Sequence, residues 1–163
     1  MNKIKIYLDT SVISHLQALD VPIKMKITNE FWNMIMINKK YSVYISEVVL
    51  EEIDNCKDNK KKLLLGELSK LGYILIERNE KALKLQNKYL ENNVLKIKSK
   101  DDLLHIALAI VSDIDYIVSW NFKHFVNIKT ITKVNEVNIN NGYGYVNILS
   151  PESMIKEVKT DGK

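Results

Sequence analysis

Short runs rich in β-branched and aromatic residues alternate along this chain with longer segments of helical periodicity, and this alternation most constrains the fold. The strand-like runs lie at Ile4 to Leu8, Tyr41 to Ile45, Tyr73 to Ile76, Tyr116 to Ser119 and Val146 to Leu149. Apolar residues recur at helical spacing in 28–38, 47–56, 59–71, 80–92, 100–111 and 132–139. Because strands alternating with helices favour a parallel sheet covered on both faces, the sequence predicts an α/β chain with three layers, α/β/α, and a mainly parallel central sheet.

The chain is expected to form one domain. Its 163 residues are enough for one substantial core, and no Pro/Gly/Ser-rich linker divides the pattern. Hydrophobic residues make up 46% and charged residues 27%, a balance that excludes disordered and fibrous classes. We therefore predict a single domain over 1–158, followed by a flexible tail at 159–163.

Composition also limits the setting and the chemistry. No apolar run approaches the roughly 18 to 20 residues that span a bilayer, and the first ten residues lack a signal-peptide pattern, so we expect a cytoplasmic protein without a membrane partner. Cys56 is the only cysteine, which excludes an intramolecular disulfide and a cysteine-based metal site. The net charge of +4 is compatible with a polyanionic partner but identifies none.

Two acidic residues follow predicted strands. Asp9 comes directly after the first strand, where ligands bind in open parallel sheets. After the second strand, Val48 and Val49 mark the inward stripe of a helix, and Glu52 continues this stripe. Glu51 falls on the solvated side, so Glu52 is the better candidate.

A third acidic residue, Asp102, opens the segment SKDDLLHIALAIV. This helix is apolar nearly all round, so it should be deeply packed and hold Asp102 rigidly at its start. The alternative role of Asp102 is structural, in a capping-box-like arrangement with Ser99 as the cap. His105 lies one turn later on the same face, and we expect it to support a ligand through a hydrogen bond rather than to be one.

The fourth strand leads into Ser119, Trp120, Asn121, Phe122 and Lys123. Ser119 and Asn121 can reach a shared polar cleft, although Ser and Asn also form turns and helix caps well. The two aromatic residues are more often packing residues than base-stacking platforms, and the lysine can face phosphate or solvent.

Three acids after separate elements supply hard oxygen ligands of the kind that Mg²⁺ or Mn²⁺ prefers, unlike the imidazole and thiolate sets of zinc sites. If the acids converge, they repel one another without a cation and can position water with one. The predicted metal and catalytic residues are therefore Asp9, Glu52 and Asp102.

In order and spacing, four segments together resemble the PIN-domain superfamily, particularly its VapC-like ribonuclease toxins. They are YLDTSVIS around Asp9, ISEVVLEEI around Glu52, KDDLLHIALA around Asp102 and IVSWNFKHF around Asn121. The resemblance implies a twisted parallel sheet flanked by helices, with the three acids at metal-binding positions and Ser11 and Ser119 at small polar positions beside them. It also implies hydrolysis of RNA to 5′-phosphate and 3′-hydroxyl ends.

Partners follow from the same resemblance: an RNA substrate, an antitoxin protein if the chain is the toxin of a type II toxin–antitoxin pair, and a second copy in a homodimer. The chain departs from the family at the fourth acidic position, where Asn121 stands with His124 close by. That departure weakens the expectation of a second metal ion.

Two other functions compete with a metal-dependent ribonuclease. The first is a catalytically impaired PIN-like module that binds nucleic acid or a partner protein, which Asn121 favours. The second is a phosphatase of the haloacid-dehalogenase type, which also begins with an aspartate after its first strand. That class needs a second aspartate two residues later, where this chain has Ser11.

Overall fold

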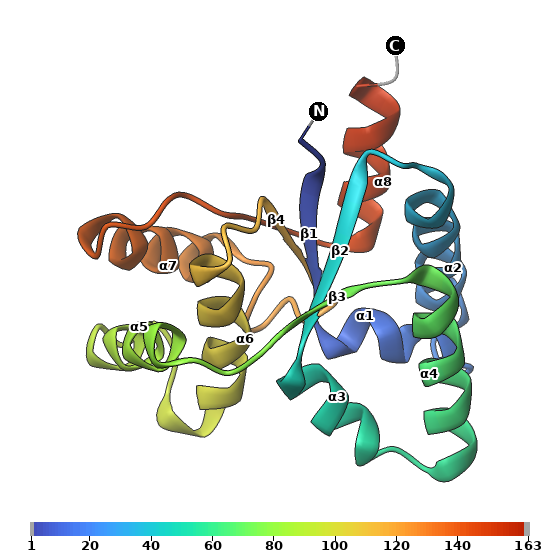
Figure 1. Ribbon diagram of the computed structural model, residues 1–163, viewed down its shortest axis with the longest axis horizontal. Helices are drawn as coiled ribbons and strands as arrows, with labels where there is room; N and C mark the ends of the chain where they lie inside the picture. The colour runs from blue at the N-terminus through green and yellow to red at the C-terminus, as the bar shows by residue number, and fades with distance from the viewer. Residues whose placement is uncertain (1, 162–163) are drawn as a thin grey trace.

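Five short strands form one sheet at the centre of the computed structural model, which describes residues 2–161 (Figure 1). Its strands are β1 (Ile4–Leu8), β2 (Tyr41–Ser46), β3 (Ile74–Ile76), β4 (Tyr116–Val118) and β5 (Asn147–Leu149). They lie in the order β3-β2-β1-β4-β5, and every neighbouring pair is parallel. The predicted parallel sheet is confirmed, and all five carboxyl ends consequently lie at one edge.

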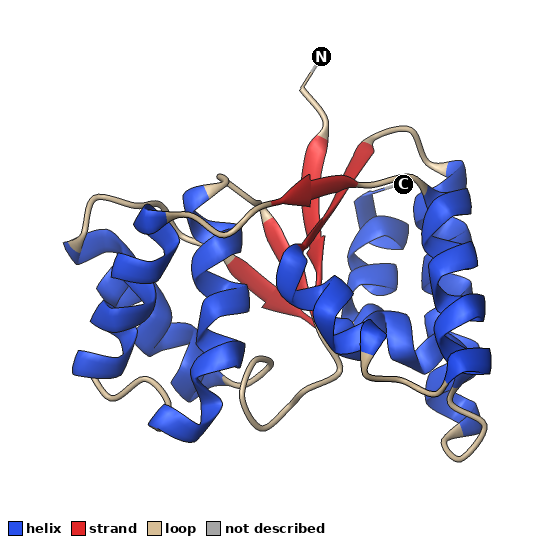
Figure 2. Ribbon diagram, turned by 60° about the horizontal axis from the view of Figure 1, so that its bottom comes forward, coloured by secondary structure: helices blue, strands red, loops and turns tan. Residues whose placement is uncertain are grey.

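Helices cover both faces of this sheet (Figure 2). They are α1 (Thr10–Ser14), α2 (Pro22–Ile37), α3 (Glu47–Asp54), α4 (Asp58–Leu71), α5 (Glu80–Glu91), α6 (Lys100–Val111), α7 (Ile128–Asn140) and α8 (Pro151–Asp161). One layer contains α5, α6 and α7, and the other contains α2, α4 and α8, while α1 and α3 start at the carboxyl ends of β1 and β2 (Figure 1). The three-layer α/β/α prediction is therefore confirmed.

The core lies where β1 and α6 run through the middle of the fold. Ile6, Tyr7 and Leu8 of β1 have no exposed surface. Every residue from Leu103 to Ile110 in α6 is buried, as its nearly all-round apolar pattern predicts. Burial of this kind is the main favourable contribution to folding, and it fixes the residues that follow β1 and begin α6.

The structure contains a helix that periodicity did not predict. Helix α8 begins at Pro151, a residue whose fixed φ suits the first helical position. Ser150 caps it by accepting a hydrogen bond from the Ser153 amide at 3.1 Å, and Met154 and Ile155 are buried in the core. The predicted tail at 159–163 begins inside this helix, and positions 162 and 163 lie outside the described residues.

The alternative role of Asp102, in a capping box with Ser99, is not observed. Ser99 ends a short 3₁₀ helix (Ile97–Ser99) that runs directly into α6, and its side chain makes no capping hydrogen bond. A side-chain cap needs an extended backbone, whereas Ser99 has φ −104° and ψ 22°. Asp102 is therefore not part of a capping box, and its carboxylate is available for other contacts.

Among residues 2–161, no helix is both long enough and apolar enough to cross a membrane.

Candidate functional site

Asp9 occupies the end of β1, where it caps α1 and retains only 5% of its exposed surface. One carboxylate oxygen, Oδ1, accepts hydrogen bonds from the Ser11 amide at 3.0 Å and the Ser11 hydroxyl at 2.5 Å. The other, Oδ2, accepts from the Ser119 hydroxyl at 2.9 Å. The carboxylate is therefore held in one orientation by groups from two adjacent strand ends.

The segment after β4 completes this network. The Trp120 amide donates to the Ser11 hydroxyl oxygen, and the Asn121 amide donates to the Ser119 hydroxyl oxygen, both at 2.9 Å. The structure thus brings Ser11 and Ser119 to Asp9, as the sequence suggested. Asn121 points its oxygen elsewhere, because Oδ1 accepts from the amides of Lys123 at 3.1 Å and His124 at 2.9 Å. Its observed role is turn formation.

Burial dominates the electrostatics of Asp9. It raises the pKa of the carboxyl above its ordinary value, while the charge of His105 and the hydrogen bonds from Ser11 and Ser119 oppose the rise. A cation beside Asp9 would therefore stabilise its ionised form, whereas burial without a cation favours its neutral form.

Glu52 and Glu51 point in different directions, as the helical stripe predicts. The Glu52 Oε1 atom contacts Nε2 of His105 in a close hydrogen bond. Glu51 forms a bidentate ion pair with Arg78, both of its hydrogen bonds being 2.6 Å long. Glu52 is therefore the glutamate of α3 that faces the interior histidine.

His105 links Glu52 to the centre of the sheet. Its Nδ1 lies 2.6 Å from the Tyr7 hydroxyl, which in turn lies 2.8 Å from the Ser46 hydroxyl. A carboxylate accepts hydrogen bonds, so the Nε2–H group of His105 donates to Glu52, while Nδ1 shares a hydrogen bond with the Tyr7 hydroxyl. Burial raises the pKa of Tyr7, and the charges of Asp9 and Glu52 raise it further, so this hydroxyl keeps its proton.

Asp102 is held by a second histidine. Its Oδ2 atom lies 2.6 Å from Nδ1 of His124, in the turn that follows β4. The two side chains are 28% and 23% exposed, so this pair is only partly shielded from water. Each of the two less buried predicted acids therefore has an imidazole partner, whereas Asp9 has hydroxyl partners.

The donor chemistry suits a hard divalent cation, since Asp9, Glu52 and Asp102 all offer carboxylate oxygens. Within residues 2–161, however, no three His, Cys, Asp or Glu side chains are arranged to hold a metal ion. Glu52 and Asp102 are turned to their histidines instead. Sharing of one cation by the three acids stays a prediction.

Sequence reasoning missed two residues of this site. Tyr7 is the only hydroxyl-bearing residue within the apolar strand β1, and a buried hydroxyl needs a partner. That requirement indicates a hydrogen-bond partner for Tyr7, which in the structure is His105. The sequence marks His124 only as a neighbour of Asn121, because nothing in the local pattern indicates that α6 lies beside this turn.

No family model matches the sequence, and none of the curated proteins matches it either. A chain in the crystal structure of VapBC2 from Rickettsia felis, bound to a DNA fragment from their promoter, is similar in fold, with a TM-score of 0.60. The two chains are 18% identical over 90% of this chain and 98% of that one. At this identity the likeness concerns the fold alone, a three-layer α/β/α arrangement around a parallel sheet.

Proposed function

We propose that this protein is a metal-dependent endoribonuclease that hydrolyses RNA phosphodiester bonds in the cytoplasm. The observation that carries the proposal is the placement of acids in the parallel fold. Asp9 ends β1, Glu52 lies in the helix that follows β2, and Asp102 opens the buried helix α6. Each carboxylate is oriented by at least one hydroxyl or imidazole. Oriented carboxylates at this edge are better suited to binding a charged ligand than to packing.

Asp9, Glu52 and Asp102 would hold Mg²⁺ or Mn²⁺, which when bound supplies an activated water and neutralises charge on the phosphodiester. Ser11 and Ser119 keep Asp9 in position, as their hydrogen bonds to its two oxygens indicate. His105 performs the same task for Glu52. Histidines and hydroxyls that orient ligands in this way commonly change metal affinity by about 10- to 100-fold when removed.

We propose a single cation. The turn from Trp120 to Phe125 contains no acid, and the oxygen of Asn121 is engaged with two backbone amides. A second ion would therefore have few hard ligands on this side.

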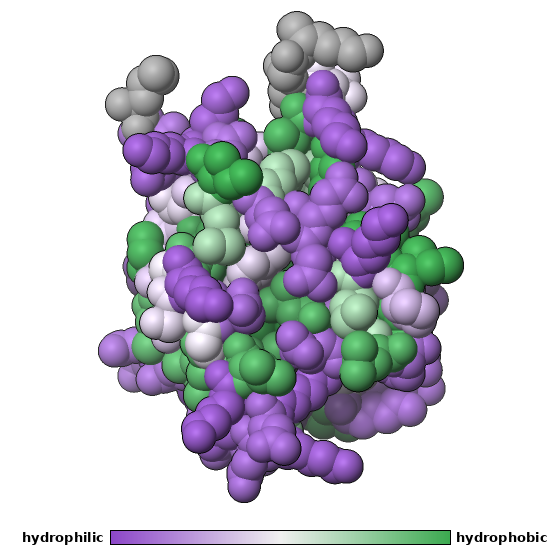
Figure 3. Space-filling view, turned by 90° about the vertical axis from the view of Figure 1, so that its right-hand side faces the viewer, coloured by the Kyte–Doolittle hydropathy of each residue, from purple (hydrophilic) through white to green (hydrophobic). Residues whose placement is uncertain are grey.

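We further propose that the chain is the toxin of a type II toxin–antitoxin pair and forms a homodimer. The fold likeness is to a chain of a VapBC complex. Hydrophobic patches lie among hydrophilic side chains on the side of the molecule that carries α2 and α4 (Figure 3). Ile23 and Ile37 of α2 are 76% and 79% exposed, and Leu63 of α4 is 53% exposed. Such side chains support contact with another protein chain.

A second candidate function is a PIN-like module that binds nucleic acid or a partner without cleaving it. Two observations favour it. Glu52 and Asp102 are both engaged with histidines. Asn121 stands at the position where the PIN-domain resemblance implies a fourth acid. Metal-dependent cleavage separates the two candidates, because only the nuclease requires it.

The test is cleavage of mixed RNA and single-stranded DNA during a manganese titration, with Glu52→Gln compared to Glu51→Gln. Glu52→Gln should lower the rate by about 100-fold or more, because a lost metal ligand removes several kcal/mol of transition-state stabilisation. Glu51→Gln should cleave like the wild type, since Glu51 contacts Arg78 at the surface.

A triple variant, Asp9→Asn with Glu52→Gln and Asp102→Asn, controls for contaminating nuclease. If Glu51→Gln abolishes cleavage while Glu52→Gln leaves it intact, the assignment of Glu52 is wrong. Absence of cleavage by the wild type at every manganese concentration would instead favour the binding module.

A further inference from the structure

A cavity of about 450 Å³ beside the turn that carries His124 is lined by an unusual number of cations. We call it the lysine pocket. Its ten lining residues include five lysines, contributed by the loop before α6, the turn after β4 and the first half of α7: Lys96, Lys98, Lys123, Lys129 and Lys133. The remaining lining residues are neutral polar or apolar side chains and His124.

The lysines of the lysine pocket are not neutralised by ion pairs among residues 2–161. None of its lining residues is acidic. None of its lysines takes part in an ion pair with any residue from 2 to 161, and the one lysine contact there is Lys133 Nζ to the Asn93 carbonyl oxygen at 3.3 Å. Like charges gathered in this way repel one another, so an anion between them would be stabilising.

The amino end of helix α7 adds to the positive charge of the lysine pocket. Lys129 lies in its first turn, which contains no acidic residue. The amino end of a helix carries partial positive charge, and a cation there is unfavourable. Lys129 therefore increases the attraction for a negative group instead of neutralising the helix end.

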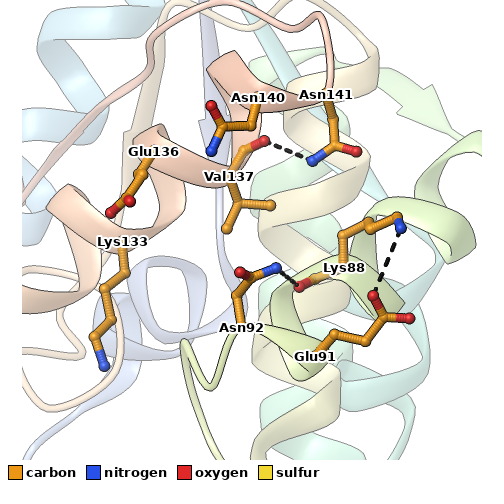
Figure 4. A pocket seen from close by; sticks show the side chains of 8 residues that line it. All are labelled: Lys88, Glu91, Asn92, Lys133, Glu136, Val137, Asn140 and Asn141. Atoms are coloured by element: carbon orange, nitrogen blue, oxygen red, sulfur yellow. Dashed lines mark hydrogen bonds and ion pairs between the residues drawn. The ribbon is translucent and has the colours of Figure 1, made fainter.

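A second cavity, between α5 and α7, shows how a balanced surface differs (Figure 4). It is lined by Lys88, by Lys133, which it shares with the lysine pocket, and by Glu91 and Glu136, and Lys88 pairs with Glu91 at 3.6 Å. The amides of Asn92 and Asn141 donate to carbonyl oxygens of their own helices, each at 2.8 Å. Its polar groups are largely engaged, so it offers no comparable attraction for an anion.

The lysine pocket adjoins the acidic site through His124. His124 lines the pocket and its Nδ1 atom lies 2.6 Å from Asp102. Lys123, the preceding residue, also lines the pocket, and its amide donates to Asn121. The lysines are therefore close enough to the acids to contact the same polyanion.

We infer that the lysine pocket binds backbone phosphates of single-stranded RNA on one side of the bond to be cleaved, an inference that rests on the proposed ribonuclease function. Lysine is a flexible point charge without the planar geometry that reads a base, so the pocket contributes affinity that does not depend on sequence. Phosphate contacts of this kind release counterions, which makes the affinity dependent on salt.

The experiment measures binding of a fluorescent single-stranded RNA by anisotropy in EDTA, where metal-dependent cleavage is absent, over a range of salt concentrations. The variant is Lys98→Gln with Lys129→Gln. Losing two phosphate contacts should weaken binding and reduce the slope of log affinity against log salt by about 1.4, from roughly 0.7 per contact on single strands. A second variant, Lys96→Gln with Lys123→Gln, should behave alike.

The matched control is Lys39→Gln with Lys40→Gln, which removes the same charge next to the amino end of β2, at the opposite edge of the sheet. It should leave the salt slope unchanged. If the control and the pocket variants reduce the salt slope equally, net charge alone determines the affinity. If the pocket variants leave the slope unchanged, the RNA binds elsewhere. Either result overturns the inference. If binding depends on the pocket but the wild type cleaves nothing with manganese, phosphate binding by the lysine pocket stands and the proposed ribonuclease function fails.

Discussion

The site contains two carboxylate–histidine pairs that share their chemistry and differ in their surroundings. In the inner pair, Glu52 with His105, the histidine side chain is 3% exposed and also bonds the Tyr7 hydroxyl. In the outer pair, Asp102 with His124, the histidine is 23% exposed and belongs to a surface turn. The inner imidazole is fixed from both sides, whereas the outer one can exchange its partner for water. Burial thus makes His105 part of the core, although Glu52 is itself 43% exposed, and leaves the outer histidine adaptable.

The largest difference should appear on removing the two rings. His105→Ala should lower the free energy of unfolding by about 3 kcal/mol, because it empties buried space and removes a shared partner of Tyr7 and Glu52. His124→Ala should lower it by less than about 1 kcal/mol, as expected for a partly exposed pair. Urea denaturation of both variants measures these values. Equal losses would remove the distinction between the inner and outer pairs.

A smaller loss is expected from Tyr7→Phe, which leaves Ser46 and His105 without the hydroxyl they share. An unpaired buried polar group costs roughly 1 to 3 kcal/mol. Tyr89→Phe is the matched control. The buried Tyr89 hydroxyl donates a hydrogen bond of 2.5 Å to Asn138 and contacts none of the three acids. Both variants should lose stability, but only Tyr7→Phe should also slow RNA cleavage. Equal cleavage by the two variants would mean that the hydrogen bonds from Tyr7 through His105 do not position Glu52.

The smallest effect, of opposite sign, concerns Asp9→Asn in EDTA. Burial raises the pKa of Asp9 above its ordinary 3.8, so the folded state loses stability as the pH rises from below 3.8 through the raised value. Asparagine does not ionise and can still accept the Ser11 amide. The variant should therefore melt higher than the wild type near pH 7, and the advantage should vanish at acidic pH. A pH-independent difference in melting temperature would contradict the raised pKa.

The sequence predicted more of the fold than of the site. Apolar periodicity located all five strands within a residue or two, and the stripe of α3 separated Glu52 from Glu51. It missed α8, whose short amphipathic pattern follows a proline that also suits a chain reversal. It also left a cap at Ser99 open as an alternative, because a serine before a helix does not reveal its own backbone angles.

Periodicity and strand-end position are properties of neighbouring residues, so the sequence by itself determined the alternating layers, the parallel sheet and the polar residues at its carboxyl edge. Only the tertiary structure decided which side chains meet there. Tyr7 and His105 lie 98 positions apart, and Asp9 and Ser119 lie 110 apart. They meet because β1 lies between β2 and β4 and α6 packs in the core, an arrangement set by long-range pairing that no local pattern encodes. The lysine pocket has the same origin, since its cations come from three separate segments.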